Sequence, residues 1–543
     1  MAQNSPAARA ADGPPISDAA GHPRRWLILG VLVFSLLVVV LDNTVLNVAL
    51  KTIALPKPNG LGASQSDLEW SINSYTLIFA GLLFTWGILA DRLGRKRILM
   101  LGMVLFGITS VLCAYAGSPG ELIAARAAMG FAGAAIMPST LAVIANVFPR
   151  HEQGKAIGVW AGSVGLAVAI GPVVGGALLD SFWWGSVFLI NVPIIIIGLI
   201  AMTFMVPESR NPNPGKLDPA GVLLSMAGLV IFVYGVIHGG DTGDWGKPAV
   251  WGPLVIGVAL LALFVVWERN TDHPALDVRL FSNRPFSAAV ISVALSFFAM
   301  MGSLFFLTFY LQSVRGYTPL QAGLWVLPFA AAQVIFSPLS ANVVSRFGAR
   351  TVSFSGLLLI AVALSLYQFI GVHSAMWVYG VIAALQGIAM ALVMPPATTT
   401  VMTSLPRERA GIGSSINNTV RQVGGALGVA VLGTVLTSAY RGKIEPVLTG
   451  SGVPAGVAHD VSGSIEATQG FVAQSAAQHP QAVQLLAPAD NAFVHALHVS
   501  TLCASGVAVL AALLVLAWLP RRGAGTGSGA PQGAPQAAES VTA

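Results

Sequence analysis

Apolar stretches of about 20 residues, separated by short polar segments, recur from one end of the chain to the other. An α-helix needs that length to cross about 30 Å of hydrocarbon. The apolar residues form solid blocks and do not alternate with polar ones, as they would in the strands of a membrane barrel. The pattern therefore predicts an all-α polytopic membrane protein with 14 transmembrane helices. The predicted helices span 26–50, 70–90, 98–117, 121–147, 155–179, 187–206, 217–238, 250–268, 286–312, 318–344, 351–371, 375–404, 411–440 and 493–519.

Composition and charge support that prediction. Hydrophobic residues make up 55% of the 543 and charged residues 9%, whereas about a quarter of the residues of a soluble protein are charged. The formal net charge is +6, and the lysines and arginines gather in alternate loops such as 92–97, 150–155 and 346–350. Cytoplasmic loops of membrane proteins carry that excess. We therefore expect a multi-pass protein of the cell (cytoplasmic) membrane with both termini in the cytoplasm, and no nucleic-acid partner.

Two segments recur along the chain. "MGFAGAAIMPSTLAVIANVFPRHEQG" (129–154) aligns with "QGIAMALVMPPATTTVMTSLPRERAG" (386–411), and "DRLGRK" (91–96) aligns with "SRFGAR" (345–350). Because both matches are displaced by nearly the same number of residues, they predict two six-helix halves with a helix pair inserted between them. Parallel repeats of six helices are the pattern of major facilitator transporters, whose substrate site lies near the midplane between the halves.

The repeat predicts how the chain is divided. The expected parts are a disordered cytoplasmic tail (1–25), an N-terminal six-helix half (26–206), an inserted helix pair with flanking loops (207–285), a C-terminal six-helix half (286–519) that contains an external loop (441–492), and a second disordered cytoplasmic tail (520–543). Within the external loop, 464–477 could form a short amphipathic hairpin over the outer mouth. A disordered connector explains its composition equally well.

The loop after the second predicted helix reads "GILADRLGRKRIL". Ordinary positive-inside charge explains its basic residues but not its glycines or Asp91. Gly87 and Gly94 permit close backbone approach and a tight turn. Asp91 can pair with a helix N-terminus or with Arg92 or Arg95, as a latch that one transport state makes and the other breaks. We assign these five residues to a conformational gate. The segment resembles the signature loop of the major facilitator superfamily, G-x-L-A-D-R-x-G-R-[KR].

The fifth predicted helix, "GVWAGSVGLAVAIGPVVGGALL", is similar to the antiporter motif of that superfamily, G-x8-G-x3-G-P-x2-G-G, which is typical of exporters. The matching residues are Gly158, Gly171, Pro172, Gly175 and Gly176, while Ala167 replaces one glycine. A Gly-Pro bend with a face of small residues permits close helix contact and could act as a hinge or seal. Small residues also pack any membrane bundle, so the simpler structural role stays open.

Other segments resemble one branch of the superfamily, the fourteen-spanner drug:proton antiporters. "LIAARAAMGFAGAA" (122–135) is similar to the superfamily's motif in the fourth helix. "LDNTVLNVAL" (41–50), "HPALDVRLF" (273–281) and "GSSINNTVRQVGGALGVAVLG" (413–433) are similar to signatures of the branch. The resemblance implies a major facilitator fold and efflux of drugs or antibiotics. In "WWGSVF", Gly185 stands where the branch usually carries an arginine, so no gating arginine is assigned there.

Besides Arg421, which belongs to the cavity candidates below, two charged residues fall well inside predicted helices. Asp42 is the only acidic residue that the prediction places deep in a helix, and Arg126 lies within the fourth. A charge at the bilayer centre costs about 2.5–3.5 kcal/mol, and a carboxyl group in a low-dielectric site can load and release protons. We assign Asp42 to proton coupling, with Arg126 as a second charge that tunes Asp42 or relays protons, and the resemblance implies the same for Asp42. The alternatives are a structural Asp42 paired with an arginine or with Asn43 and Asn47, and an Arg126 that reaches an interface or binds carbonyls.

A substrate cavity is expected where the ninth, tenth and thirteenth predicted helices carry large or polar side chains at helical spacing. The candidates are Phe298, Met301, Phe305, Phe309, Trp325, Gln333, Asn417, Asn418, Arg421 and Gln422. Each aromatic residue could instead face lipid, and the polar residues could form hydrogen bonds between helices. Since the ninth and tenth helices hold no acidic residue, a dication is disfavoured, and we expect neutral or monocationic lipophilic substrates.

These observations favour a proton-coupled antiporter that exports lipophilic drugs or antibiotics by alternating access and confers resistance. The alternatives are an exporter or flippase of a dedicated lipid or natural product, and a membrane sensor that transports nothing. An enzyme is disfavoured, because the sequence contains no G-x-x-x-x-G-K-[ST] nucleotide loop, no metal-spaced His/Cys cluster and no nucleophile elbow. We therefore expect no cofactor, metal or nucleotide. The expected partners are a small lipophilic substrate, protons and the lipid bilayer, and the expected form is a monomer.

Overall fold

The computed structural model describes residues 21–210, 216–274, 276–404, 410–476 and 479–519. The two predicted tails fall almost entirely outside these residues. The described α-helices are α1 (Arg25–Ala54), α2 (Gln65–Leu93), α3 (Arg95–Ala114), α4 (Pro119–Val147), α5 (Arg150–Ser181), α6 (Ser186–Leu189), α7 (Asn191–Met205), α8 (Pro219–Thr242), α9 (Pro248–Asn270), α10 (Arg284–Phe309), α11 (Pro319–Leu324), α12 (Leu327–Phe347), α13 (Ala349–Ser365), α14 (Met376–Thr403), α15 (Ala410–Gly450), α16 (Ala455–Val461), α17 (Ile465–Ser475) and α18 (Leu486–Trp518). Shorter turns are η2 (Val278–Ser282), the π-helical η3 (Tyr310–Val314), η4 (Leu366–Phe369) and η6 (Pro480–Leu485).

The helices match the predicted membrane spans in order. In the described part of the chain, 13 helical segments are long and apolar enough to cross a membrane. The remaining predicted span, 155–179, falls in the 32-residue α5, where several side chains lie outside the described ones. Local sequence explains where several helices begin: Ser64 and Asp67 form a capping box at the start of α2, and the Ser118 side chain caps α4.

The internal repeat reappears as a structural repeat. Gly94 and Gly348, the aligned glycines of the two short loops, both have positive φ angles, 118° and 83°, which a side chain would strain. Gly130 of α4 and Gly387 of α14 are also equivalent, because each lies in close contact with the backbone of a neighbouring helix. A Cβ added to Gly130 would lie 2.4 Å from the Tyr75 carbonyl oxygen of α2, and one added to Gly387 would lie 2.2 Å from the Phe329 carbonyl oxygen of α12. The two segments therefore repeat in three dimensions as well as in sequence.

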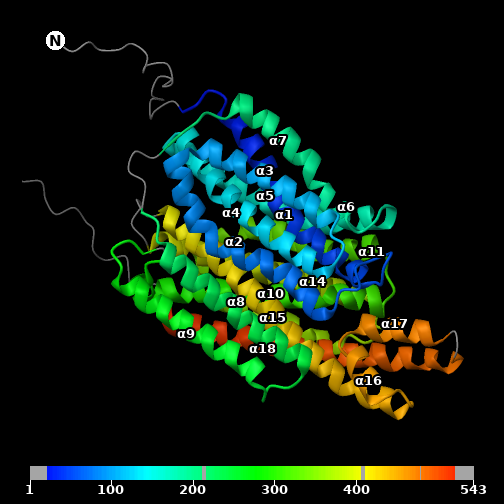
Figure 1. Cartoon of the computed structure of the whole chain (residues 1–543). Helices are drawn as coiled ribbons and strands as arrows, with labels where there is room; N and C mark the ends of the chain where they lie inside the picture. The colour runs from blue at the N-terminus through cyan, green and yellow to red at the C-terminus, as the bar shows by residue number, and fades with distance from the viewer. Residues whose placement is uncertain (1–20, 211–215, 275, 405–409, 477–478, 520–543) are drawn as a thin grey trace, which may run out of the picture.

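Helix packing follows the same repeat. In the first six spans α1 packs on α5 and α7, α2 on α4, and α3 on α4 and α7. In the last six spans α10 packs on α15 and α18, α12 on α14, and α13 on α14 and α18. Figure 1 shows the first set, blue through cyan to blue-green, on one side of the bundle and the second set, green to red, on the other. The two halves meet where α2 contacts α15 and where α5 contacts α11 and α12.

The inserted helices α8 and α9 form a hairpin at the edge of this interface. They pack against each other, and α8 also contacts α2 and α15, one helix from each half. Only 11% of the most apolar stretch of α9 is buried in the protein. The pair therefore covers one seam between the halves, and α9 presents most of its surface outward.

The region predicted as an external loop is largely helical. α15 continues to Gly450, past residue 440 where the predicted span ends, and α18 begins at Leu486, before the predicted start at 493. Between them lie α16 and α17, which extend beyond one end of the bundle (Figure 1). We call this the α17 end. The hairpin suggested for 464–477 is wrong: described residues 465–475 form the single helix α17, because Ile465, Thr468 and Val472 recur at helical spacing and are buried.

Candidate functional site

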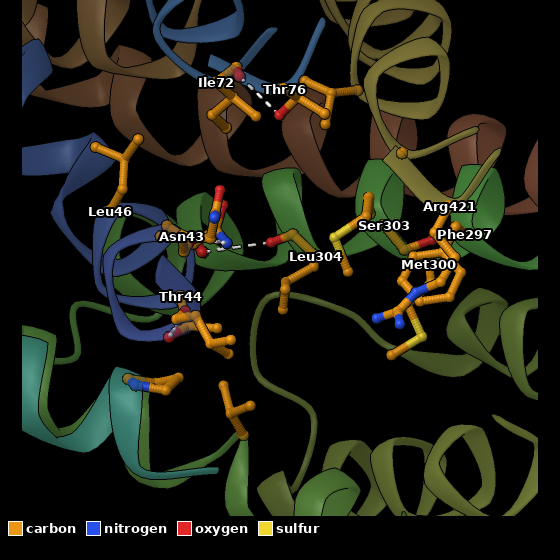
Figure 2. Close-up of a pocket in the computed structure, with 18 of the residues that line it drawn as sticks. Asn43, Thr44, Leu46, Ile72, Thr76, Phe297, Met300, Ser303, Leu304 and Arg421 are labelled. Carbon is orange, nitrogen blue, oxygen red and sulfur yellow. Dashed lines mark hydrogen bonds between the residues drawn. The ribbon is translucent and has the colours of Figure 1, made fainter. Parts of the chain in front are cut away.

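A central cavity of about 220 Å³ lies between the two halves. Its wall comes from α1, α2, α4 and α5 on one side and from α10, α12, α14 and α15 on the other. Figure 2 shows Asn43 and Thr44 of α1 facing the cavity opposite Phe297, Met300 and Arg421. The cavity therefore occupies the place between the halves where the repeat predicts a substrate site.

Half of the predicted cavity residues line this cavity. Met301, Trp325, Asn418, Arg421 and Gln422 belong to its wall. The other five predicted residues do not belong to the described wall and are corrections: Phe298, Phe305, Phe309, Gln333 and Asn417.

The corrections on α10 have one cause, the rotation of the helix about its axis. On α10 the wall includes Phe297, Met300, Met301, Leu304 and Thr308, which recur at i, i+3, i+4, i+7 and i+11 along one face. Phe298, Phe305 and Phe309 lie on the neighbouring face. The Phe298 carbonyl oxygen would be 2.1 Å from a Cβ added to Gly428 of α15, and Phe305 and Phe309 are 0% and 1% exposed. This face packs into the C-terminal half.

The two remaining corrections concern polar residues. The Asn417 amide donates a 3.4 Å hydrogen bond to the Thr398 hydroxyl of α14, so it joins two helices of the C-terminal half. Gln333 is half-buried on α12, one turn after Phe329, and does not reach the wall to which Phe329 belongs. Each of these residues lies one turn from a wall residue, Arg421 or Phe329, so helical spacing identified the face but not how far along the helix the cavity extends.

Asp42 and Arg126 form a buried ion pair. The Arg126 Nη1 atom donates to Asp42 Oδ2, joining α4 to α1, and each side chain is only 1% exposed. Arg126 also lines the central cavity. The two intramembrane charges that the sequence singled out are therefore partners, and one of them reaches the cavity wall.

Other groups hold this ion pair in place. Arg126 Nε donates to the Ser71 carbonyl oxygen at 3.1 Å, and its guanidinium lies over the Tyr75 ring at 4.4 Å. The Asn191 amide donates to Asp42 Oδ1 at 3.2 Å and to the Ser110 hydroxyl at 3.0 Å. Sequence reasoning missed Asn191, although an asparagine at the start of an apolar run was a signal that could have identified it.

Asn43 and Asn47, the suggested alternative partners of Asp42, bond elsewhere. The Asn43 amide donates to the Val39 carbonyl oxygen at 2.9 Å, and the Asn47 amide donates to the Asn43 carbonyl oxygen at 3.1 Å. Both residues line the cavity. In the structure, therefore, Asp42 pairs with an arginine and not with Asn43 or Asn47.

Arg421 extends from α15 into the wall of the cavity. Its guanidinium carbon lies 4.5 Å from the centroid of the Phe297 ring, and Figure 2 shows the two side chains together. Within the described part of the chain, the Arg421 side chain forms no hydrogen bond and no ion pair. The cavity thus holds a cation whose described contact is an aromatic face.

The predicted gate loop has the expected ion pair. Arg95 Nη2 lies 3.0 Å from Asp91 Oδ1, and Arg95 Nη1 donates to the Ala142 carbonyl oxygen of α4 at 3.2 Å. The 118° φ angle of Gly94 explains the turn. At Gly87 an added Cβ would approach nothing nearer than the Pro138 side chain at 3.7 Å, so close packing in this structure does not require glycine there. Arg92 is exposed.

The antiporter-motif glycines lie at close helix contacts. A Cβ added to Gly171 would lie 1.9 Å from Thr44 Oγ1 of α1, and one added to Gly175 would lie 2.7 Å from Val45 Cγ1. On another face, a Cβ on Gly176 would lie 2.4 Å from Leu320 Cα of α11. The Pro172 carbonyl oxygen approaches Gly323 of α11. The motif therefore packs α5 against both halves, while Gly158 lies outside the side-chain positions that the structure describes.

Two further positions bear on the sequence analysis. Gly185 has no room for a side chain, since its added Cβ would lie 2.2 Å from the Ala114 carbonyl oxygen. Glu69 is another buried acidic residue, which the sequence analysis did not single out. It is 2% exposed within the span Gln65–Leu93, and its Oε1 atom would lie 2.3 Å from a Cβ on Gly433 of α15. The predicted second helix began at residue 70 and so excluded Glu69.

Known proteins resemble this chain in sequence and in fold. The model of the Major Facilitator Superfamily matches residues 32–429. The multidrug efflux pump LfrA of Mycolicibacterium smegmatis is 35% identical over 91% of this chain and 95% of its own length. The tetracenomycin C resistance and export protein of Streptomyces glaucescens is 33% identical over 78% of each chain. The methyl viologen resistance protein SmvA of Salmonella typhimurium is 31% identical over 90% of this chain and 97% of its own.

Solved structures support the fold. The inward-open xylose transporter XylE from E. coli is 16% identical, with a TM-score of 0.53 over 92% of this chain and 98% of its own. A bacterial homologue of the lysosomal transporter Spinster, in an inward-facing conformation, is 19% identical, with a TM-score of 0.61 over 91% of this chain and 98% of its own. Two six-helix halves with an inserted pair, together with these relatives, show that the chain is a multi-pass membrane transport protein of the major facilitator superfamily, in its drug-efflux branch.

Proposed function

We propose that this protein exports lipophilic drugs or antibiotics across the cell membrane in exchange for protons and thereby confers resistance. The observation that carries the proposal is the buried Asp42–Arg126 pair, one member of which lines the cavity. Relatives named as multidrug efflux, resistance and export proteins, matched over most of the chain, support the cargo class. They favour export of drugs over the alternatives of a dedicated lipid flippase and a non-transporting sensor.

The ion pair offers a way to couple the two fluxes. When Asp42 carries no proton, its charge holds Arg126 in the interior of the N-terminal half. A proton on Asp42 removes that charge, so Arg126 loses its counter-charge and the pair separates. Arg126 belongs to both the ion pair and the cavity wall. Protonation of Asp42 and binding of substrate therefore both act on Arg126, and the two compete for one conformation of the wall. One proton entering the cell supplies about 2.3 kcal/mol per 100 mV and about 1.4 kcal/mol per pH unit.

The orientation follows from charge. The basic loops, including 92–97, lie at the end opposite α17, so the positive-inside rule puts the α17 end outside and both termini in the cytoplasm. At the α17 end, Lys51 of α1 donates to the Gln312 carbonyl oxygen, and the Gln312 amide donates to the Val48 carbonyl oxygen at 2.8 Å. These bonds join the halves on the outer side. They support a state that is closed to the outside.

Alternating access then requires these outer contacts to open. The halves 26–206 and 286–519 rock about the cavity as two bodies, within a monomer. The α5 glycines allow α5 to seal against α11 in one state, and the Asp91–Arg95 pair belongs to the gate at the cytoplasmic end. Asp42 is protonated from outside, and it releases its proton inside as substrate loads.

Proton release from inverted membrane vesicles tests the proposal. Vesicles with an acidic lumen are given lipophilic monocations, neutral antibiotics or acidic compounds, and an external pH dye is followed. Wild type is expected to release protons when a substrate is added, and Asp42→Asn is expected not to. Asp244→Asn is the matched control, because Asp244 is an exposed loop carboxylate paired with Lys247. A normal response from Asp42→Asn would contradict the assigned role of Asp42.

A further inference from the structure

We propose that the central cavity selects acidic lipophilic compounds, and that Arg421 binds their carboxylate or enolate oxygen. The inference rests on the proposed export function and names the class of substrate for the same cavity. It replaces the expectation from sequence that neutral and monocationic compounds are preferred.

The charges of the cavity wall carry the inference. Arg126 and Arg421 are the charged residues of the described wall, which includes no aspartate or glutamate. Arg126 is neutralised by Asp42, with which it forms an ion pair. Arg421 has no such neighbour among the described residues, and an arginine keeps its charge at any physiological pH. The cavity therefore carries one uncompensated positive charge.

The surroundings of Arg421 leave its donors available. Its guanidinium lies against the Phe297 ring at 4.5 Å, a contact that uses the flat face of the group. The N–H groups at the edge of a guanidinium match the two oxygens of a carboxylate. Arg421 has no hydrogen bond within the described part of the chain, so those N–H groups remain for a ligand. An acidic substrate would supply the missing counter-charge.

The rest of the wall fits the body of such a compound. Phe329, Trp325 and Tyr379 provide aromatic surface, and Met300 and Met301 provide flexible apolar surface. Asn418 and Gln422, on the same helix as Arg421, add amide groups that can bind carbonyl or hydroxyl substituents. A planar aromatic acid would pack against the rings and place its acidic group at Arg421. A cation of the same size would meet a like charge that no wall carboxylate offsets.

Three matched fluorescent probes test this selectivity: 1-pyrenebutyrate, its methyl ester, and a pyrenylbutyl trimethylammonium ion. Binding to the purified protein and substrate-triggered proton release from inverted vesicles are both measured. A hydrogen-bonded pair with a charged group changes affinity about tenfold to hundredfold. Wild type is therefore expected to bind the acid at least about tenfold more tightly than the ester or the cation.

Variants of Arg421 assign the effect. Arg421→Gln is expected to make acid and ester bind alike, whereas Arg421→Lys keeps the preference for the acid. Arg346→Gln is the control, because it removes the charge of an exposed arginine. The inference is overturned if wild type prefers the ester or the cation, or if Arg421→Gln weakens acid and ester equally. The relative affinities of the wild type for the acid, the ester and the cation test the selectivity even where a variant fails to fold.

The two readouts separate the inference from the function on which it rests. If the ester or the cation triggers proton release and the acid does not, the export function stands and the selectivity fails. If the acid binds tightly but no probe triggers proton release, the binding site stands and the proposed proton-coupled export fails. Proton release with the acid, lost in Arg421→Gln, supports both.

Discussion

Neutralising either member of the Asp42–Arg126 pair is expected to destabilise the folded protein more than neutralising both. Both side chains are 1% exposed, so the pair belongs to the buried class, in which removal of one partner costs about 3–5 kcal/mol. Asp42→Asn leaves the Arg126 charge with uncharged contacts, which include the Ser71 carbonyl oxygen and the Tyr75 ring. These contacts put the expected cost near the lower end, about 3 kcal/mol.

A second effect adds to the cost of Asp42→Asn. The carboxylate accepts from Arg126 on one oxygen and from the Asn191 amide on the other, at 3.2 Å. An asparagine has one acceptor oxygen in place of two, so its NH₂ group must face one of these donors. An unsatisfied buried donor costs about 1–3 kcal/mol. The total expected for Asp42→Asn is thus about 4–6 kcal/mol in the free energy of unfolding.

A double-mutant cycle measures the coupling. The free energy of unfolding in detergent is determined for wild type, Asp42→Asn, Arg126→Gln and the double variant. The double variant is expected to be more stable than the sum of the two single effects by about 3 kcal/mol, because it contains no uncompensated charge. Glu152→Gln is the matched control: it breaks the Arg25–Glu152 pair, whose side chains are 23% and 24% exposed, and should cost at most about 1 kcal/mol. Additive single effects would refute the coupling.

Three further predictions concern packing, burial and pH. Gly428→Ala should lower stability by about 1–3 kcal/mol in thermal melts, since its Cβ would lie 2.1 Å from a backbone oxygen of α10. Gly442→Ala, with nothing within 4 Å, should not destabilise the protein. Glu69→Gln should leave the melting temperature unchanged or raise it, because it removes a carboxylate that is 2% exposed; a loss as large as that of Asp42→Asn would contradict this. Burial raises the pKa of Glu466, and the bond from Ser313 opposes the shift. The docked α17 therefore holds more protons than the free helix, so its docking is strongest below about pH 4.3 and weakens as pH rises through the raised pKa. A spin label on Gly470→Cys should become more mobile with rising pH, and Glu466→Gln should abolish that change.

The sequence predicted the parts of the fold that depend on strong local rules. Membrane helices require long apolar runs, and a charge among them stands out, so the spans and the two charges Asp42 and Arg126 were accessible, although their pairing was not. The repeated glycines were accessible for a similar reason, because positive φ angles and close backbone contacts tolerate few other residues. Gly94 and Gly348 show this, since both end a helix with positive φ.

Other features depend on how helices are rotated and where they stop. Phe298 and Phe297 are neighbours in sequence, yet Phe297 lines the cavity while Phe298 packs toward α15. An apolar helix with similar residues on every face gives no periodic signal that selects one direction. Glu69 and Asn191 were missed for a related reason. Each lies near the end of a predicted helix, where boundaries are uncertain by a few residues and a polar group looks exposed.

The direct test of the central claim is whether Asp42 couples substrate movement to protons. In inverted vesicles, a substrate found by proton release is measured in two ways: accumulation driven by an imposed pH gradient, and exchange of labelled for unlabelled substrate with no gradient. Wild type should perform both, and Asp42→Asn should keep the exchange while losing accumulation. If Asp42→Asn still accumulated substrate in response to the gradient, Asp42 would not be the coupling carboxylate.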